Sequence, residues 1–294
     1  MDHYLEVFVK VVEKGNFSKA AEDLHMTQPA VSQYIKVMEE SVGARLLERS
    51  NKFVRLNKAG EIVFHHAKEI LALYSNMQYL IDDLTNKASG PIAIGASYTF
   101  GEYILPHIIA RLQAKYPLIT PTIQIHNTKE IIDLVQTHQL DIGIVEGHIN
   151  EKVPNVEIVS EDKMVIVASP QLPLLKEGRR GKIAELGEET WILREKGSGT
   201  REAAEHLFDS LDFTPKKVME FGSTQVIKES VEAGLGISLL SQWAIKKELM
   251  YGYLDIVDVE GLPFKRNFSI LTHSPYQTKA LQQFIEALRE YLGG

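Results

Sequence analysis

The sequence predicts an α+β protein of several domains: a small helical unit, one long helix, and two α/β lobes. Three observations lead to this fold class. Short amphipathic helices come first, an apolar repeat at helical spacing follows, and from residue 92 onward strand-like apolar runs alternate with helical segments. With 294 residues, of which 44% are hydrophobic, the chain can bury more than one core.

The composition is that of an ordinary globular protein. The chain has no cysteine, which excludes disulfides, thiolate metal sites and cysteine nucleophiles, and this fits a reducing compartment. No run of about 18 apolar residues occurs, and the first residues carry no basic signal region. We therefore expect a cytoplasmic protein with no membrane span.

Two short helices open the chain. An apolar face runs from Tyr4 to Val12, and Gly15 stands where a helix end favours left-handed backbone. Ser18 is the expected N-cap of a second helix at residues 19–24. The two alanines of that helix are small enough to let another helix pack closely.

A third helix is expected after Met26. Thr27 is its expected N-cap, proline falls in its first turn, where it is tolerated, and Gly43 marks its end. The outward side chains near its start are Gln28, Ser32, Gln33 and Lys36. Such groups suit base edges and phosphates, so the helix could read a DNA major groove. The alternative is a polar solvated face, since these residue types are common on any exposed helix.

A basic hairpin is expected next. The segment RSNKFVRLN reads as two extended pieces, and residues 45–58 hold five basic side chains against one acidic one, although the whole chain carries a net charge of −7. Lying along the sugar–phosphate backbone, this hairpin would complete a winged helix-turn-helix over residues 1–58. A merely solvated charged loop is the alternative. The residues expected at the DNA are Ser18, Thr27, Gln28, Pro29, Ser32, Gln33, Lys36, Arg49, Lys52 and Arg55.

An apolar repeat with gaps of four and three residues follows, as in a coiled-coil seam: Val63, Ala67, Ile70, Tyr74, Met77, Ile81 and Leu84. It predicts a long helix that pairs with a second copy, within a linker and hinge at residues 59–90. Two-fold pairing would present two recognition helices to successive major-groove faces, so the DNA site should be an imperfect palindrome. The alternative is a helix that lies on its own domain.

Strands and helices alternate through the rest of the chain. Strands are expected at IAIGAS, TIQIH, DIGIV, MVIVAS, WIL, VMEF, GISLL and FSILTH. Helices are expected at residues 101–116, after Asn127, after Ser198, after Ser223, and at residues 277–292. We expect a mostly parallel sheet and a regulatory domain at residues 91–294, with lobe I at about 91–165 and 268–294 and lobe II at about 166–267.

Hydroxyl and backbone groups gather at the carboxyl ends of these strands, where α/β sheets bind ligands. The candidates for holding a small polar or anionic ligand are Ser97, Tyr98, Thr99, Thr128, Glu146, Gly147, Ser198, Gly199, Thr200 and Ser223. Each serine or threonine taken alone also fits a plain N-cap. Their convergence from five strand ends is what predicts a pocket.

Catalytic and metal motifs are not found. The chain has no G-x-S-x-G, no H-E-x-x-H, no phosphate-binding P-loop and no full G-x-G-x-x-G. His65 and His66 fall on the long helix and are expected to be surface or interface residues. We therefore expect no enzyme, no cofactor and no metal.

The stretch FSKAAEDLHMTQPAVSQYIKVMEESVGARLLERS, with VRLNKAGE after it, resembles the N-terminal signature of LysR-type transcriptional regulators. GSGTR and EAGLGISLL resemble the effector domain of that family, so the similarity covers essentially the whole chain. It implies a linker helix that forms dimers, a regulatory domain like a type 2 periplasmic binding protein, and tetramers built as dimers of dimers. It also places the start of the third helix in the groove and the hydroxyl residues in an inducer cleft.

The expected function is therefore a regulator whose binding to promoter DNA is modulated by a small polar or anionic metabolite, with RNA polymerase as a further candidate partner. The cleft is similar to that of members governing sulfur assimilation or carbon fixation. One alternative is an enzyme or a solute-binding protein whose N-terminal helical domain is incidental to its function. An enzyme would need a catalytic motif, and a solute-binding protein would need an export signal. A regulator without a ligand is the other alternative.

Overall fold

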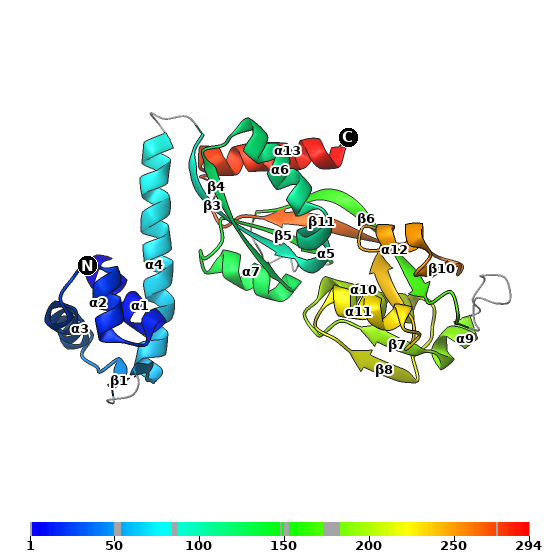
Figure 1. Ribbon diagram of the computed structural model, residues 1–294, viewed down its shortest axis with the longest axis horizontal. Coiled ribbons are helices and arrows are strands. Elements are labelled where there is room, and N and C mark those ends of the chain that lie inside the picture. The colour runs from blue at the N-terminus through cyan, green and yellow to red at the C-terminus, as the bar shows by residue number, and fades with distance from the viewer. Residues whose placement is uncertain are drawn as a thin grey trace. The chain divides into compact units, whose positions relative to one another are not determined.

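The computed structural model describes all residues except 1, 50–53, 84–87, 148, 150–152, 154, 173–182, 275 and 294. The chain divides into two compact units, Met1–Leu84 and Thr85–Gly294, and each is described by itself (Figure 1). Among the described residues, no helix has both the length and the apolar character needed to cross a membrane.

Three helices open the first unit: α1 (Asp2–Lys14), α2 (Phe17–Asp23) and α3 (Gln28–Val42). They share one buried core, in which Phe8 and Ile35 are fully enclosed. The predicted limits of α3 are confirmed. The hydroxyl of Thr27 accepts the N–H of Ala30, and Gly43 ends the helix in the left-handed conformation at φ +75°.

The start of α2 differs from the prediction. Asn16, not Ser18, is the N-cap, because the Asn16 Oδ1 accepts the N–H groups of Ser18 at 2.8 Å and Lys19 at 3.0 Å. Asn16 has extended backbone, which aims its short side chain at both free N–H groups. The helix therefore begins at Phe17, and the prediction that Ser18 caps it is wrong.

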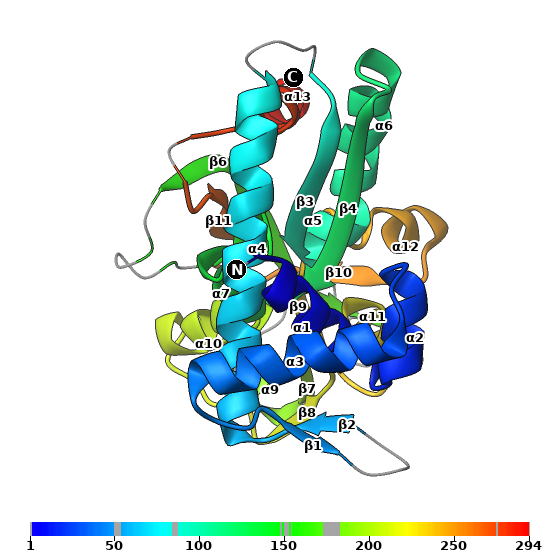
Figure 2. The same cartoon turned by 90° about the vertical axis from the view of Figure 1, so that its left-hand side faces the viewer.

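The predicted hairpin is confirmed on both of its strands. β1 (Leu47–Arg49) pairs antiparallel with β2 (Val54–Leu56), and Figure 2 shows it beside the start of α4. The turn of the hairpin, with Lys52, lies outside the described residues.

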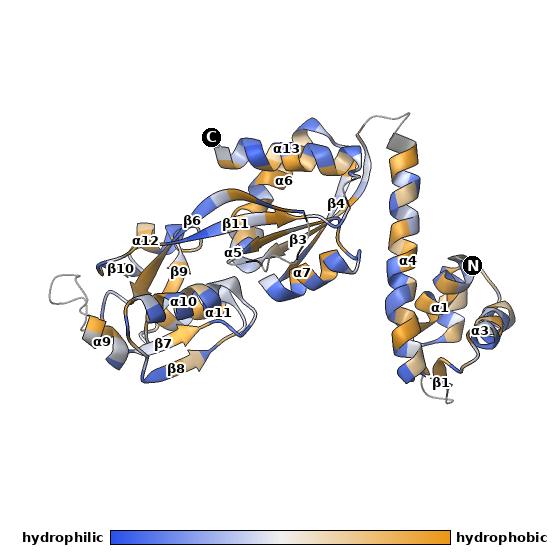
Figure 3. Ribbon diagram, turned by 180° about the vertical axis from the view of Figure 1, so that it is seen from behind, coloured by the Kyte–Doolittle hydropathy of each residue, from blue (hydrophilic) through white to orange (hydrophobic). Residues whose placement is uncertain are grey.

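The long helix α4 (Lys58–Asp83) carries apolar residues along its length, visible as orange bands in Figure 3. Asn57 caps it by accepting the N–H of Gly60 at 2.8 Å. Ala67 is only 1% exposed and Val63 packs beside it, both in the core shared with α1. The predicted seam is therefore wrong at Ala67, whereas Val63 is partly buried and stays a prediction. The last residue of the seam, Leu84, lies outside the described part. The exposed apolar stripe of α4 consists of Ile62, Ile70, Leu73, Tyr74, Met77 and Ile81.

The second unit is built on a seven-stranded sheet in the order β10-β6-β11-β5-β3-β4, with β9 also paired to β6. Its strands are β3 (Gly90–Ser97), β4 (Ile119–His126), β5 (Ile142–Glu146), β6 (Val156–Ala168), β9 (Ser238–Ser241), β10 (Asp255–Val257) and β11 (Phe264–Leu271). β3 is parallel to β4 and β5, whereas β6 and β11 are antiparallel to all their partners. The sheet is therefore mixed, not mostly parallel, because β6 and β11 pass between the lobes in opposite directions.

β6 and β11 form a ribbon that joins the two lobes. Their pairing runs from Phe264 opposite Met164 to Leu271 opposite Val156, with an irregularity after Phe268. Both predicted lobe boundaries fall inside these strands. Lobe II adds a parallel pair, β7 (Thr190–Leu193) and β8 (Lys217–Glu220).

Helices cover both lobes (Figure 1). They are α5 (Tyr98–Tyr103), α6 (Leu105–Lys115), α7 (Thr128–Gln136), α9 (Ile183–Glu188), α10 (Gly199–Ser210), α11 (Thr224–Glu232), α12 (Lys246–Tyr251) and α13 (Lys279–Gly293). The single helix predicted at 101–116 is two helices that meet at Ile104, with Pro106 in the first turn of α6. The capping box of Asn127 with Glu130 is confirmed at α7.

Candidate functional sites

The predicted DNA-reading face lies on the solvent side of α3. Gln28, Pro29, Gln33 and Lys36 are exposed, and Ser32 is partly buried. The Gln28 Nε2 donates to the Ser32 Oγ at 2.9 Å, and the Lys36 ammonium lies 3.8 Å from the Glu40 carboxylate. These polar groups therefore occupy one face of a helix whose opposite face is buried at Val31, Ile35 and Met38.

Four other predicted DNA residues lie at the start of α3, on the hairpin and on α2. The Thr27 hydroxyl serves as the N-cap of α3, and the Arg55 side chain is exposed on β2. Arg49 is the last residue of β1. Ser18 lies in the first turn of α2, where its N–H bonds to Asn16.

Most predicted ligand residues lie where the lobes meet. The buried ones are Ser97, Thr99, Thr128, Glu146, Ser198, Gly199 and Thr200, and the partly buried ones are Tyr98, Gly147 and Ser223. The Thr128 hydroxyl donates to the Glu146 carbonyl at 2.9 Å. A Cβ on Gly199 would collide with that same carbonyl, so only glycine lets α10 of lobe II approach β5 of lobe I this closely.

The plain N-cap alternative holds for one of these residues. The Ser198 hydroxyl accepts the Thr200 N–H at 3.2 Å at the start of α10. Ser97 and Ser223 stand at the N-cap positions of α5 and α11 without a side-chain capping bond. The Ser97 hydroxyl instead donates to the Ile144 carbonyl at 3.4 Å.

Arg266 on β11 links the two lobes at this place. Its Nη2 donates to the Thr99 hydroxyl of lobe I, and its Nη1 donates to the Thr200 hydroxyl of lobe II, each at 3.1 Å. Its Nε donates to the Asp162 Oδ2 on β6 at 2.8 Å, and the Asp162 Oδ1 accepts the Ser241 hydroxyl at 2.6 Å. Two predicted ligand residues from different lobes thus share one buried cation.

Glu146 brings a second carboxylate to Arg266. Its side chain is 1% exposed, and its Oε1 lies 3.6 Å from the Arg266 Nη1. Its Oε2 has no hydrogen-bond partner among the described residues. Burial raises the pKa of Asp162, while the charge and hydrogen bond of Arg266 act in the opposite direction. Because two buried carboxylates share one guanidinium, a ligand donor at the Glu146 Oε2 would satisfy a buried acceptor.

Arg194 forms a second buried contact beside the cleft. Its Nε and Nη2 donate to the two carboxylate oxygens of Glu195 at 2.7 and 2.8 Å, and its Nη1 donates to the Thr224 hydroxyl at 3.3 Å. Burial raises the pKa of Glu195, but the hydrogen bonds and charge of Arg194 outweigh it and leave that pKa below its usual range. The guanidinium also lies 4.1 Å from the centroid of the Tyr98 ring, so lobe II holds this predicted ligand residue of lobe I.

A cavity of about 590 Å³ opens between the lobes. Thr128 and Lys129 line it from the start of α7, and Lys196 and Ser198 line it from the loop before α10. The lobes touch here, because the Lys129 N–H donates to the Gly197 carbonyl at 3.2 Å. The lining holds three basic side chains, Lys129, Lys196 and Arg201, and three acidic ones, Asp133, Glu202 and Glu205. The feature that suits an anionic ligand group is therefore the pair of helix N-termini, those of α7 and α10.

Sequence reasoning missed Arg266, Asp162 and Arg194. A signal existed for the first, because Arg266 stands between Phe264 and Phe268 at the period of two that places side chains on one face of a strand. A charge at an inward position of a strand is rarely buried without a partner. Asp162 has the same alternation in VSEDKMVIV, but nothing in the sequence pairs it with a residue 104 positions away.

Comparisons with known proteins match both units. The family model described as "Bacterial regulatory helix-turn-helix protein, lysR family" matches residues 3–61, and the one described as "LysR substrate binding domain" matches residues 85–293. The HTH-type transcriptional regulator CysL of Bacillus subtilis (strain 168) is 39% identical over 288 residues, which cover 97% of this chain and 95% of CysL.

Solved structures agree with this match. The regulatory domain of Synechocystis PCC6803 CcmR, solved in complex with 2-PG, is 28% identical, with a TM-score of 0.62 over 69% of this chain and 98% of that domain. Full-length CbnR, solved with its target DNA, shares the fold at 20% identity, with a TM-score of 0.73 over 99% of each chain. With one family model matched over residues 3–61, another over residues 85–293, and a relative 39% identical along 97% of the chain, the chain belongs to the LysR family of DNA-binding transcriptional regulators.

Proposed function

We propose that this regulator binds an imperfect palindrome in promoter DNA and that a small anionic metabolite between its two lobes biases the equilibrium between two arrangements on that DNA. The observation that carries this proposal is the sharing of Arg266 by Thr99 of lobe I and Thr200 of lobe II. An anionic ligand would accept the O–H of either hydroxyl while the hydroxyl oxygen still accepts from Arg266, so it would add a bond at the contact between the lobes. Such a ligand shifts the equilibrium only through different affinities for the two arrangements.

Several features support an anionic ligand of sulfur or central carbon metabolism. The N-termini of α7 and α10 both face the cavity, whose basic and acidic side chains are equal in number. The CcmR domain, which is similar over most of the second unit, was solved with 2-PG. The same proposal assigns residues 1–58 to DNA binding, 59–90 to pairing and the hinge, and 91–294 to effector binding in the cytoplasm.

The groove-facing part of α3 is tested by changing its glutamines. Gln28→Ala and Gln33→Ala should each reduce the preference for the specific site by about 1–3 kcal/mol per lost base contact, because paired hydrogen bonds to a base edge disappear. Arg55→Ala should weaken binding to every sequence alike and reduce the salt slope by about 1. Fluorescence anisotropy on the DNA upstream of the protein's own gene, at several salt concentrations, measures both effects.

The matched control for this experiment is Gln136→Ala, which removes an exposed glutamine from α7 in the second unit. It should leave both sequence preference and salt slope unchanged. If Gln28→Ala and Gln33→Ala also left sequence preference intact, α3 would not be the reading helix.

The cleft is tested by removing hydroxyls. Ser97→Ala and Thr99→Ala should each weaken binding of the effector, and with it the change in the DNA footprint, by roughly 10- to 100-fold, the value of a hydrogen bond to a charged group. Titration calorimetry with 2-PG and with inorganic sulfate measures the first effect, and footprinting measures the second. Ser210→Ala, whose hydroxyl bonds to the Leu207 carbonyl at the end of α10, is the control. An unchanged response in both cleft variants would refute the assignment.

A further inference from the structure

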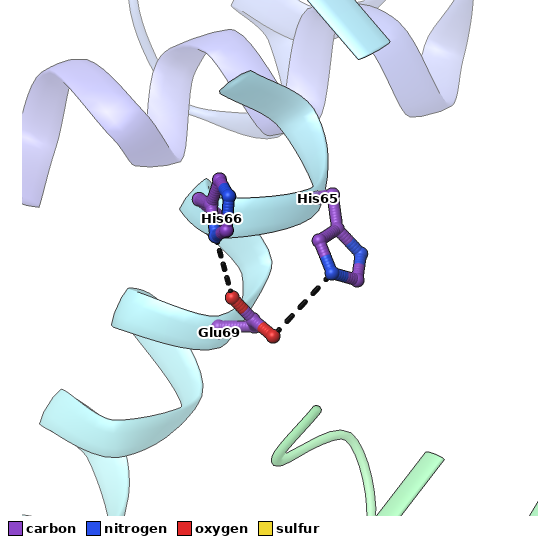
Figure 4. A group of neighbouring side chains, drawn as sticks. All are labelled: His65, His66 and Glu69. Carbon is purple, nitrogen blue, oxygen red and sulfur yellow. Dashed lines mark hydrogen bonds and ion pairs between the residues drawn. The ribbon is translucent and has the colours of Figure 1, made fainter. Parts of the chain in front are cut away.

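The side chains of His65, His66 and Glu69 converge on the surface of α4. Figure 4 shows the carboxylate of Glu69 between the rings of His65 and His66. The His65 Nε2 lies 3.4 Å from the Glu69 Oε1, and the His66 Nδ1 lies 2.8 Å from the Glu69 Oε2. The three groups offer ligand atoms that all lie within 4.8 Å of one another.

Helix geometry explains the convergence. Glu69 follows His66 by three residues and His65 by four, and both spacings bring side chains together on a helix surface. Neighbouring histidines normally point away from each other, and here the one carboxylate draws both rings toward it. Glu69 is only 22% exposed, so its position is held, while both imidazoles are more than half exposed and free to adjust.

We propose that His65, His66 and Glu69 bind Zn²⁺ or a similar divalent transition metal. Two imidazole nitrogens and one carboxylate oxygen are a donor set of zinc and related metals, whereas Ca²⁺ and Mg²⁺ prefer oxygen alone. A tetrahedral ion at about 2.0–2.2 Å from each ligand needs ligand atoms roughly 3.4 Å apart. Small rotations of the two exposed rings achieve this, and water fills the fourth position.

Two other His–Glu pairs on the surface of the chain can be compared with this group. The His3 Nδ1 lies 3.2 Å from the Glu6 carboxylate, and the His126 Nδ1 lies 3.4 Å from the Glu130 carboxylate, and each pair has one imidazole. Within the described part of the chain, His65, His66 and Glu69 form the only group of three such ligands. All three ligands of the site come from one chain.

Titration calorimetry of the untagged, metal-free, full-length protein with ZnCl₂ tests the site. One Zn²⁺ should bind per chain. The variants His65→Gln, His66→Gln and Glu69→Gln should each weaken zinc binding by at least about tenfold, because losing even a residue that only hydrogen-bonds to a metal ligand has an effect of that size. His3→Gln removes a histidine of the same helical His–Glu type and should bind zinc like the unaltered protein.

Circular dichroism of each variant, before and after zinc, should show unchanged helix content, because the three side chains are on the surface of α4. The inference is overturned if no saturable one-to-one binding occurs in the unaltered protein. It is equally overturned if the α4 variants bind zinc as the His3→Gln variant does.

Discussion

Replacing Arg266 with methionine should lower the free energy of unfolding of the second unit by about 3–5 kcal/mol, the cost of removing one partner from a buried ion pair. The change leaves the carboxylates of Asp162 and Glu146 without their shared cation, and it leaves the Thr99 and Thr200 hydroxyls without their donor. Urea unfolding followed by tryptophan fluorescence measures this loss, because both tryptophans, Trp191 and Trp243, lie in the second unit.

The same variant should show a characteristic pH dependence. Burial already raises the pKa of Asp162, and removing the opposing charge of Arg266 raises it further. A carboxyl group whose folded-state pKa is raised destabilises the fold most above that pKa, and the penalty fades as the pH falls and the group takes up its proton. The stability gap between the variant and the unaltered protein should therefore narrow on acidification.

Arg289→Met is the matched control. Arg289 forms a bidentate pair with Glu157, but the two side chains are 55% and 48% exposed. An exposed pair contributes about 0–1 kcal/mol, so its loss should be small. Equal losses for Arg266→Met and Arg289→Met would contradict a structural role for the buried cluster.

Placing a charge in the exposed apolar stripe of α4 should abolish pairing of the chain. Leu73 is 46% exposed at the middle of that stripe, and Leu73→Glu would bury an unpaired carboxylate in any interface formed there. Loss of the second reading helix should lower affinity for a palindromic site by about 10²- to 10⁴-fold while leaving half-site affinity nearly unchanged. Sedimentation velocity and anisotropy on full and half sites measure the two effects.

Met250→Glu controls for the added charge, since Met250 is 78% exposed on α12 of the second unit. It should change neither the assembly nor the affinity for DNA. If the unaltered protein sedimented as a monomer, or if Leu73→Glu and Met250→Glu behaved alike, the stripe would not be a pairing surface.

Local signals in the sequence predicted local structure well. Thr27 and Gly43 mark the ends of α3, and Asn127 with Glu130 marks the start of α7, because a cap involves residues only a few positions apart. The error at Ser18 is of the same short range. Two residues that can form a cap, Asn16 and Ser18, stand two positions apart, and the sequence does not reveal the backbone angles that decide between them.

Longer-range choices were beyond the sequence. An apolar repeat with gaps of four and three residues indicates that one side of a helix is buried, but not which part of the protein packs against it. Ala67 packs in the core of the first unit, not against a second copy of the chain. Likewise the cleft hydroxyls were predicted from strand ends, whereas their buried partner Arg266 comes from a strand 167 positions beyond Thr99. Residues so far apart in the sequence become neighbours only because the order of the strands in the sheet places them side by side.

The ribbon of β6 and β11 also determines how the two lobes can move. Sliding one strand along the other would break the ladder from Phe264 opposite Met164 to Leu271 opposite Val156, so shear between the lobes is resisted. Bending and twisting keep those bonds, and the irregularity after Phe268 softens the ribbon two residues from Arg266. Twisting about this ribbon is therefore the relative motion of the two lobes that leaves its hydrogen bonds intact.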